Sequence, residues 1–394
     1  MEAIVLAGGL GTRLRSCVAD LPKCMAPVGT GPFLEYLLEE LARQGVTRVI
    51  LSVGYLREKV MEYVNGRPWP FDLAWAVEEE PLGTGGGIRL ALSKAKEKRV
   101  LVLNGDTFFH LPSLAELLAV DAPVAMALKP MRDFDRYGSV ETAPVISGEV
   151  GKPLRVTAFR EKKHCAEGLV NGGVYALDRD LFRGLELPEK FSFEEAVLEP
   201  LAAEGKVAGK VFDSYFIDIG IPADYERAQR ELPELRNVLR VSSEVLATDA
   251  DTLFLDRDGV INRYLPNDYV TSLNKFVILP GIPEVMAAWA KRFSRIILVT
   301  NQRGVARGRF TRETLDEIHR RMCAVIEAAG GRIDAIYVST AIAEDDPSRK
   351  PQTGMFLTAC RDFPEIRAER SVMVGDSDSD EAFARNCGMR FVRA

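Results

Sequence analysis

The sequence has few cysteines and histidines, and neither type occurs at the paired spacings of a metal site. Six cysteines are scattered along the chain without a CxxC pair, and none of the three histidines is spaced with another ligand. We therefore expect neither a disulfide framework nor a four-ligand zinc site, which fits a reducing cytoplasm. The chain also lacks an apolar run near the roughly 20 residues of a membrane helix and a signal peptide at its start. These absences predict a cytoplasmic protein that does not bind membranes.

An excess of positive charge is absent as well. The 51 Lys and Arg residues are outnumbered by 57 Asp and Glu residues, which gives a formal net charge of −6. General binding to nucleic acid depends on neutralising phosphates, so this balance argues against a nucleic-acid partner. The length of 394 residues, of which 47% are hydrophobic, is that of a globular protein with two or three domains.

Predicted strands alternate with helical patterns in both halves of the chain. Residues 3–7 and 252–255 each have the pattern of the first strand of a parallel sheet, and each precedes a loop rich in Gly, Asp or Arg. Further strands are expected at 48–53, 100–103, 124–128, 295–300, 335–338 and 371–374, with helices at 32–44 and 312–329. This alternation predicts an α/β fold class with two doubly wound, mostly parallel, Rossmann-like domains. We place the domains at residues 1–232 and 250–394, joined by a polar linker at 233–249.

A glycine-rich loop follows the first predicted strand, in the stretch 6–14 (LAGGLGTRL). Its glycines allow backbone N–H groups to face an anion, and a hydroxyl and a guanidinium group follow for phosphate oxygens. The candidate nucleotide-binding residues here are Gly8, Gly9, Gly11 and Thr12, with Arg13 as a candidate catalytic residue. The loop is neither a Walker A loop, because no GK[ST] follows, nor a dinucleotide fingerprint. A simple turn is the alternative.

A lysine follows this loop in the stretch 22–27 (PKCMAP). Through Val28 the sequence resembles the sugar-phosphate nucleotidyltransferases, with Cys24 where that family often has Pro. The resemblance extends to about residue 230 through the segments 78–86 (EEEPLGTGG), 103–106 (LNGD), 159–162 (FREK), 171–175 (NGGVY) and 216–220 (FIDIG). It implies the following roles: base recognition by Glu78 and Gly83, Mg²⁺ binding by Asp106 and Asp218, and sugar-phosphate binding by Glu161, Lys162 and Asn171.

The chemistry of these residue types is coherent. When a sugar 1-phosphate oxygen attacks the α-phosphorus of a nucleoside triphosphate, catalysis needs alignment and charge neutralisation, which Arg13 and Lys23 can supply. The alternative makes Asp106 a helix N-cap and Asp218 a turn residue. Glu78 favours GTP, because a carboxylate accepts from both N1–H and the N2 amino group of guanine. Otherwise it is a solvated charge at a strand end.

The second loop begins with two carboxylates, Asp256 and Asp258, in the stretch 255–262 (LDRDGVIN). One carboxylate can attack phosphorus and the other can move a proton. With Thr300, Lys350 and Asp376 in later segments, the order of motifs resembles the haloacid-dehalogenase phosphatases over residues 250–394. This resemblance implies that Asp256 is the nucleophile and Asp258 the general acid and base. It implies that Thr300 and Lys350 bind the transferring phosphoryl group, and that Mg²⁺ is bound by Asp256, the carbonyl of Asp258 and Asp376, with support from Asp380.

Within that family, DRDGVIN and TNQRGVARG (300–308) are most similar to the histidinol-phosphate and heptose-bisphosphate phosphatases. The candidate sugar-phosphate-binding residues here are Asn301, Arg307 and Arg349. Arg303 stands where a small residue is usual, and it is either exposed or meets a second phosphate. Many members carry a Cys/His zinc loop before the Arg-Lys-Pro motif, whereas residues 338–349 contain neither residue type. We therefore expect Mg²⁺ in both domains and no zinc.

The combination of the two resemblances implies one pathway. A phosphatase of this kind would remove the 7-phosphate of D-glycero-D-manno-heptose 1,7-bisphosphate, and the first half, which resembles heptose 1-phosphate guanylyltransferases, would activate the product with GTP. The alternative is a nucleotidyltransferase for mannose or another hexose 1-phosphate, fused to a phosphatase of different purpose. A sensor with inactive sites would lack a catalytic residue, and none is missing. The oligomeric state is left open.

Overall fold

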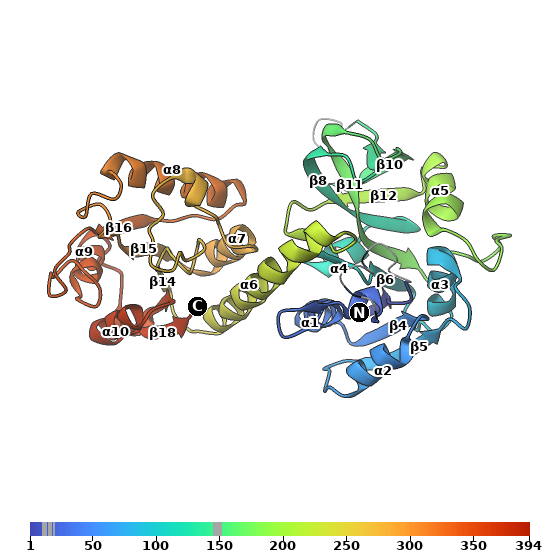
Figure 1. Ribbon diagram of the computed structural model, residues 1–394, viewed down its shortest axis with the longest axis horizontal. Coiled ribbons are helices and arrows are strands. Elements are labelled where there is room, and N and C mark those ends of the chain that lie inside the picture. The colour runs from blue at the N-terminus through green and yellow to red at the C-terminus, as the bar shows by residue number, and fades with distance from the viewer. Residues whose placement is uncertain (10–13, 15–17, 19, 145–151) are drawn as a thin grey trace. The chain divides into compact units, whose positions relative to one another are not determined.

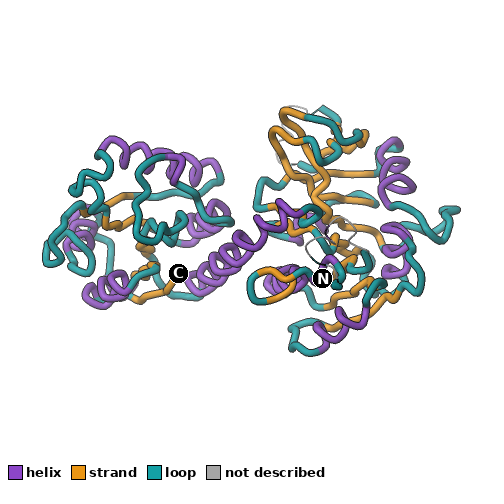
Figure 2. The backbone as a smooth tube through the Cα atoms, viewed as in Figure 1, coloured by secondary structure: helices purple, strands orange, loops and turns teal. Residues whose placement is uncertain are grey.

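The computed structural model describes residues 1–9, 14, 18, 20–144 and 152–394 (Figure 1). Gly11, Thr12 and Arg13 lie outside the described residues. The chain divides into two compact units, Met1–Arg230 and Glu231–Ala394. In each of them strands form the interior and helices flank them (Figure 2).

The first unit is built on one large sheet. Its strands are β1 (Glu2–Leu6), β4 (Arg48–Val53), β5 (Asp72–Val77), β6 (Arg99–Asn104), β8 (Val124–Phe134), β9 (Ser139–Thr142), β10 (Leu154–Phe159), β11 (Cys165–Asp178) and β12 (Val207–Val211). Two short ladders pair β2 (Pro27–Val28) with β3 (Gly31–Pro32), and β7 (Thr107–Phe109) with β13 (Phe216–Asp218). The helices are α1 (Phe33–Arg43), α2 (Arg57–Asn65), α3 (Gly83–Leu92), α4 (Leu114–Leu118) and α5 (Glu199–Ala203), with the short helices η2 (Lys23–Met25) and η3 (Glu194–Leu198).

The sheet of the first unit is mixed rather than mostly parallel. Its order is β5-β4-β1-β6-β11-β8-β12-β10-β9, and β5, β4, β1 and β6 run parallel. From β11 onward most pairs are antiparallel, because the long strand β11 runs against both β6 and β8. The α/β class expected from the sequence is confirmed, while the second half of this sheet differs from the parallel arrangement. Strand β1 of the parallel half ends at Leu6, just before Gly8 and Gly9.

The second unit contains a five-stranded parallel sheet in the order β16-β15-β14-β17-β18. The strands are β14 (Thr252–Leu255), β15 (Arg295–Asn301), β16 (Ala335–Ser339), β17 (Ser371–Gly375) and β18 (Arg390–Arg393). The helices are α7 (Ile282–Arg292), α8 (Arg312–Ala328), α9 (Gly354–Asp362) and α10 (Asp378–Cys387), with the short helices η4 (Leu273–Lys275) and η5 (Ala368–Arg370). Apolar side chains on both faces of β14 and β15 are fully buried, as expected for a parallel sheet covered by helices on both sides.

The stretch expected to be a polar linker is helical. Helix α6 (Pro222–Leu246) continues through Pro233, and only residues 247–249 of the expected linker lie outside it. Val238, Val241 and Val245 are buried in the core of the second unit. Residues 233–246 are therefore structural members of that unit and not a spacer.

No helix in the described part of the chain combines the length and the apolar character needed to cross a membrane.

Candidate active sites

The first site lies where neighbouring strands end at the same edge of the sheet. Because β1, β4, β5 and β6 run parallel, the segments that follow them come together, as at ligand sites of other α/β sheets. Asp106 comes two residues after β6. The register of the β13–β7 ladder pairs Asp218 with Thr107 and so brings Asp218 beside Asp106. Two carboxylates that are far apart in the sequence thus share one site.

A cavity of about 400 Å³ occupies this edge of the first unit. The sequence-predicted residues among its lining are Gly8, Gly9, Lys23, Glu78, Gly83 and Asp106. Other lining residues were not predicted as site residues, namely Leu6, Ala7, Cys24, Pro81, Thr84, Gly87, Asn104, Gly105 and Lys190. Cys24 is buried, and burial raises the pKa of its thiol to about 12. The thiol is therefore a packing group, which agrees with its place in a motif that often has Pro.

Lys23 joins Asp106, which lines this cavity, to Asp218. Its Nζ lies 2.5 Å from Asp106 Oδ2 and 3.6 Å from Asp218 Oδ1. Burial and the neighbouring Asp106 charge raise the pKa of Asp218 above its usual value, although Lys23 and the N–H of Gly220 oppose this. The site therefore gathers more negative charge than Lys23 balances. Paired carboxylate oxygens of this kind suit Mg²⁺, which accompanies the phosphates of a nucleotide.

Glu78 lines the same cavity, and each of its carboxylate oxygens accepts a hydrogen bond from the protein. Oε1 accepts a hydrogen bond from Ser52 Oγ at 3.0 Å, and Oε2 accepts one from the N–H of Leu82 at 3.2 Å. A side chain at Gly8 would approach Glu78 Oε1 to 2.9 Å, so the glycine makes room for the carboxylate. Each carboxylate oxygen can accept a second hydrogen bond. The group can therefore accept two further hydrogen bonds.

Lys190 is the cation that the sequence did not predict for this cavity. It belongs to the segment 187–193, which packs against α3. Arg89 of that helix donates to carbonyl oxygens of this segment. At the start of the helix, the N–H of Phe191 donates to the carbonyl of Leu82, and the N–H of Gly85 donates to the carbonyl of Phe191. Gly83 has φ +72°, and a Cβ there would lie 2.6 Å from the carbonyl oxygen of Phe191. Only glycine meets both requirements. No sequence motif pointed to Lys190, because its position depends on this docking.

The predicted sugar-phosphate residues are not equally placed. Glu161 and Lys162 are exposed in the loop between β10 and β11, and they are not among the described residues that line the cavity. Asn171 lies within β11, where its Nδ2 donates to Tyr175 Oη at 2.7 Å and its Oδ1 accepts from the N–H of Gly173 at 3.0 Å. In this structure Asn171 shapes the strand, and its binding role is a prediction that the structure does not test.

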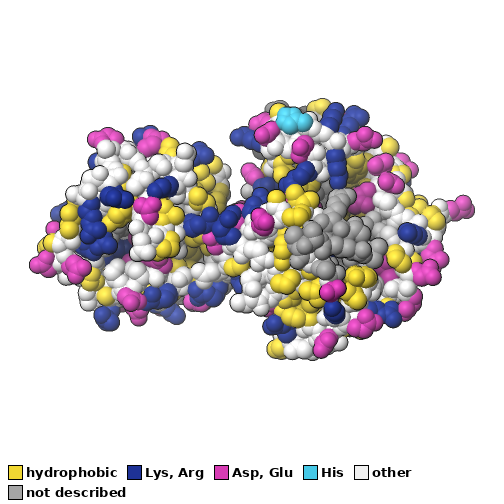
Figure 3. Space-filling model, viewed as in Figure 1, with side chains coloured by type: hydrophobic (Ala, Val, Ile, Leu, Met, Phe, Trp, Pro, Cys, Tyr) yellow, Lys and Arg dark blue, Asp and Glu magenta, His cyan; other side chains and the backbone are white. Residues whose placement is uncertain are grey.

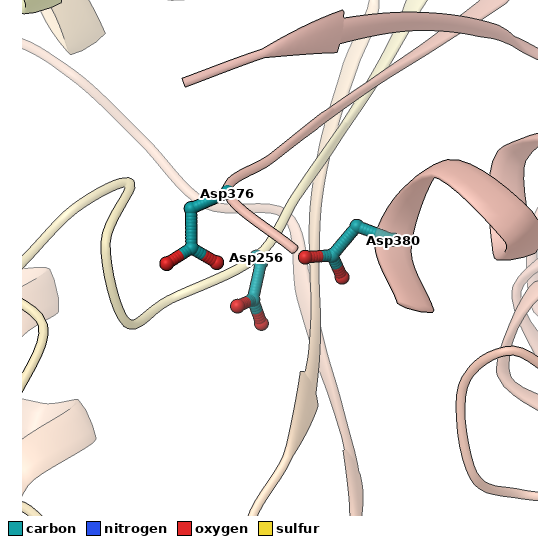
Figure 4. A group of neighbouring side chains, drawn as sticks. All are labelled: Asp256, Asp376 and Asp380. Atoms are coloured by element: carbon teal, nitrogen blue, oxygen red, sulfur yellow. The ribbon is translucent and has the colours of Figure 1, made fainter. Parts of the chain in front are cut away.

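The second site lies at the ends of the central strands of the second unit. Asp256 follows β14, Thr300 lies near the end of β15 and Asp376 follows β17. Asp380 reaches the same space from α10, where it forms a capping box with Ser377. One carboxylate oxygen from each of Asp256, Asp376 and Asp380 lies within 4.8 Å of the others, and Figure 4 shows these side chains gathered around one space.

Lys350 partly neutralises the charge of these three carboxylates. Its Nζ lies 2.8 Å from Asp256 Oδ1 and 2.5 Å from Asp380 Oδ1, and the lysine is only 2% exposed. Burial raises the pKa of Asp256 to about 7, with further contributions from Asp380 and Asp258, although Lys350 opposes the shift. Burial and Asp380 likewise raise the pKa of Asp376 to about 6. One lysine does not balance three carboxylates, and their hard oxygen donors fit a bound Mg²⁺.

Asp258 has a different environment from Asp256. Asn262 Nδ2 donates to its Oδ1 at 2.9 Å, and Gln302 Nε2 donates to its Oδ2 at 2.8 Å. Burial would raise the pKa of Asp258, but the charge of Arg257 and these hydrogen bonds hold it below its usual value. The pKa values of the two neighbouring carboxylates are therefore shifted in opposite directions.

A cavity of about 810 Å³ opens above these carboxylates. The sequence-predicted site residues in its lining are Asp256, Asp258, Asn301, Arg307, Arg349, Lys350, Asp376 and Asp380. Arg303 and Arg309 line it as well. The visible face of the second unit in Figure 3 carries several Lys and Arg side chains. A cavity with carboxylates at its base and guanidinium groups on its wall fits an anionic substrate.

Three of the predicted residues in this unit have structural partners. The Asn301 amide exchanges two 3.0 Å hydrogen bonds with the backbone of Lys350, so it positions the lysine. Arg349 donates to the carbonyl oxygens of Ala341 and Ile342. Thr300 is buried, and its Oγ1 accepts from Gln302 at 3.0 Å. Asn301 and Arg349 still line the cavity, whereas Thr300 does not.

Comparison with known proteins places the first unit in a family. Residues 2–234 match the family model described as nucleotidyl transferase, which is more than half of the chain. This chain belongs to the nucleotidyl transferase family. The nucleotidyl transferase unit is 46% identical over 236 residues to the D-glycero-alpha-D-manno-heptose 1-phosphate guanylyltransferase of Aneurinibacillus thermoaerophilus, a match that covers 59% of this chain and 98% of the relative. The enzyme of the same name from Campylobacter jejuni is 45% identical and covers 57% of this chain and 97% of the relative.

A solved structure agrees with this assignment. The HddC protein of Yersinia pseudotuberculosis is 35% identical, with a TM-score of 0.51, over 58% of this chain and 97% of that one. The second unit matches another family model over residues 249–393, described as polynucleotide kinase 3 phosphatase. The chain is thus a bifunctional enzyme, with a nucleotidyl transferase unit followed by a phosphatase unit.

Proposed function

We propose that this chain catalyses two consecutive steps of GDP-heptose biosynthesis. The phosphatase unit would remove the 7-phosphate of D-glycero-D-manno-heptose 1,7-bisphosphate, and the transferase unit would transfer GMP from GTP to the resulting heptose 1-phosphate. The observation that supports this most directly is the 46% identity of the first unit to a heptose 1-phosphate guanylyltransferase. The same chain carries a phosphatase unit whose cavity is lined by several arginines.

In the phosphatase unit, the Asp256 carboxylate would attack the 7-phosphorus and form an aspartyl-phosphate. The bond between phosphorus and the C7 oxygen breaks, and Asp258 gives its proton to the leaving oxygen. Water then attacks the aspartyl-phosphate while Asp258 takes a proton from it, so that inorganic phosphate leaves and Asp256 is regenerated. Lys350, 2.8 Å from Asp256, stabilises the charge on the phosphoryl group and orients the nucleophile.

In the transferase unit, a phosphate oxygen of heptose 1-phosphate would attack the α-phosphorus of GTP, and pyrophosphate would leave. The residues supply alignment and charge. Lys23 lies between Asp106 and Asp218 and would contact the phosphates, and Arg13 of the glycine-rich loop would do the same. Glu78 would accept the two donors of the guanine edge, and Lys162 would hold the sugar phosphate.

Both sites fit Mg²⁺. Asp106 and Asp218 would hold it in the first unit, and Asp256, Asp376 and the carbonyl of Asp258 in the second. When bound, Mg²⁺ neutralises phosphate charge in each reaction. We propose no zinc, because residues 338–349 contain neither Cys nor His. The substrates are small molecules, and we propose a cytoplasmic location.

A substrate panel tests this function. Wild-type protein and Mg²⁺ are incubated with GTP, ATP, UTP, CTP or dTTP, each combined with heptose 1-phosphate, mannose 1-phosphate or glucose 1-phosphate, and pyrophosphate is measured. We expect the highest kcat/KM for GTP with the heptose phosphate. A higher value for mannose 1-phosphate would support the alternative hexose function, and a preference for another nucleotide would contradict the role of Glu78.

A further inference from the structure

A fully buried arginine lies beneath the phosphatase loop. Arg257 is 0% exposed, and its Nη2 lies 2.9 Å from both Oδ1 and Oδ2 of Asp258. Removing a guanidinium group from water is costly, and its pairing with a carboxylate rarely returns more than that cost. The Nε of Arg257 is moreover buried without a hydrogen-bond partner. Stability alone is therefore a weak reason for an arginine at this position.

A histidine on α8 holds the other end of the same guanidinium group. His319 Nε2 lies 3.4 Å from Arg257 Nη1, and the histidine is 7% exposed. Arginine can only donate, so the histidine nitrogen must accept and the ring must be neutral. Burial and the Arg257 charge lower the pKa of His319 to about 4, which is consistent with a neutral ring. Arg257 is thus fixed between an acceptor in the core and Asp258 at the cavity.

The remaining contacts of Asp258 come from side chains that line or adjoin the cavity. Asn262 belongs to the same loop, and Gln302 follows β15. Gln302 also donates to Thr300, so it is shared with another side chain of the site. Arg257 is the partner that touches both oxygens of Asp258, and it therefore sets the plane of the carboxyl group.

We propose that Arg257 and His319 form a positioning pair that fixes the orientation in which Asp258 transfers its proton. This proposal rests on the proposed phosphatase function. In the first half-reaction the O–P bond from Asp256 forms, the bond from phosphorus to the leaving oxygen breaks, and the proton moves from Asp258 to that oxygen. Neither Arg257 nor His319 is among the residues that line the cavity. Without the acceptor on His319, the guanidinium group loses a partner and turns, and Asp258 turns with it.

The dependence of the rate on the leaving group tests this role. A sugar alkoxide needs a proton to leave, whereas p-nitrophenolate leaves without one. Because kcat/KM includes only steps up to leaving-group departure, it is measured for heptose bisphosphate and for p-nitrophenyl phosphate with saturating Mg²⁺. A general acid typically contributes about 10²- to 10⁴-fold. We expect His319→Leu to lower kcat/KM at least about tenfold for the bisphosphate, and by less than about threefold for the aryl ester.

A conservative variant separates positioning from packing. His319→Gln places an amide oxygen near the position of Nε2 and should restore most of the rate with the bisphosphate, whereas His319→Asn is too short to do so. This contrast keeps the test valid if His319→Leu does not fold. The guanylyltransferase activity of the same chain reports the amount of protein in every sample, and hydrolysis of p-nitrophenyl phosphate reports whether the phosphatase unit is folded. An equal loss with both substrates, or no difference between the Gln and Asn variants, would overturn the proposal.

A failure of the positioning pair can be distinguished from a failure of the proposed phosphatase function. Wild-type protein that hydrolyses p-nitrophenyl phosphate, with no activity in Asp256→Asn, establishes the phosphatase independently of the positioning pair. If the wild type hydrolysed neither substrate, the phosphatase function itself would be wrong, and the proposal would fall with it.

Discussion

At the scale of single residues, Glu78 shows how one carboxylate can select a base. Each of its oxygens already accepts one hydrogen bond within the protein, and each can accept one more from the guanine edge. Glu78→Gln replaces one acceptor by an N–H donor that would face a donor of the base. We expect kcat/KM for GTP to fall about 10- to 100-fold, with smaller changes for the other triphosphates.

The measurement is the nucleotide panel with heptose 1-phosphate held constant. Glu80→Gln, an exposed neighbour, is the matched control and should behave as the wild type. If Glu78→Gln kept the full preference for GTP, base selection would have to reside elsewhere.

Arg303 is the second residue with a specific expectation. It lines the phosphatase cavity and has no acidic partner within the described residues, so it would be available to the phosphate that is not hydrolysed. Arg303→Ser should raise KM for the bisphosphate about tenfold, because a charge-assisted hydrogen bond is worth about 1.5–3 kcal/mol, and should leave p-nitrophenyl phosphate unaffected. Steady-state kinetics with Arg321→Ser, an exposed arginine on α8, as control would measure this. An equal effect on both substrates would contradict it.

At the scale of secondary-structure elements, a buried ionic group joins α1 to the segment after β7. Glu40 Oε1 lies 2.6 Å from Arg43 Nη2 and 3.3 Å from His110 Nδ1. Burial would raise the pKa of Glu40, but His110 and Arg43 lower it to about 2. A lowered pKa means that the ionised carboxylate stabilises the fold above its unfolded pKa near 4.5 and that this contribution is lost as the pH falls toward 2.

We therefore expect Glu40→Gln to reduce the free energy of unfolding of the first unit by about 2–3 kcal/mol at pH 7. The difference from the wild type should shrink to less than about half at pH 3. Urea unfolding at the two pH values measures this, with exposed Glu62→Gln on α2 as the control. A difference that stayed constant with pH would show that Glu40 does not act through its charge.

Helix α6 provides a second expectation at this scale. Val245 is 0% exposed in the core of the second unit, whereas the adjacent Leu246 is 39% exposed. Val245→Ala should lower the stability of the phosphatase unit by about 2 kcal/mol through lost burial and a cavity, while Leu246→Ala should change it by less than about 0.5 kcal/mol. Thermal unfolding followed through phosphatase activity compares the two. Equal effects would mean that residues 233–246 are a spacer after all.

The same elements show what the sequence could predict and what it could not. The strands after which Asp256 and Asp376 stand were predicted correctly, because parallel strands are nearly continuous apolar runs. The first part of helix α6, residues 223–231, was predicted as a helix. Its continuation to Leu246 was missed although Leu235, Val238, Val241 and Val245 have helical spacing, because Pro233 and the polar composition suggested a break. The antiparallel half of the first sheet depends on which strands β11 meets, and spacing does not encode that. Lys190 reaches its cavity through the docking of a distant segment.

At the scale of the whole molecule, the proposed function joins two enzymes of one pathway in one chain. In this function the product of the phosphatase is the substrate of the transferase, because it still carries the 1-phosphate that the transferase consumes. Tethering raises the local concentration of that intermediate without any new contact between the units. In the proposed function the two reactions would use separate carboxylate sets, Asp106 with Asp218 and Asp256 with Asp376, so each activity should be removable without loss of the other.

The most direct test of this account is the route of the bisphosphate through the chain. Wild type, Asp256→Asn and Asp106→Asn are each incubated with Mg²⁺, GTP and the heptose bisphosphate, and phosphate, pyrophosphate and nucleotide sugar are followed by mass spectrometry. We expect the wild type to release phosphate first and then form GDP-heptose, and Asp106→Asn to release phosphate only. Asp256→Asn should form neither product, yet make GDP-heptose from heptose 1-phosphate. A nucleotide sugar formed from the bisphosphate by Asp256→Asn, or no phosphate from the wild type, would contradict the account.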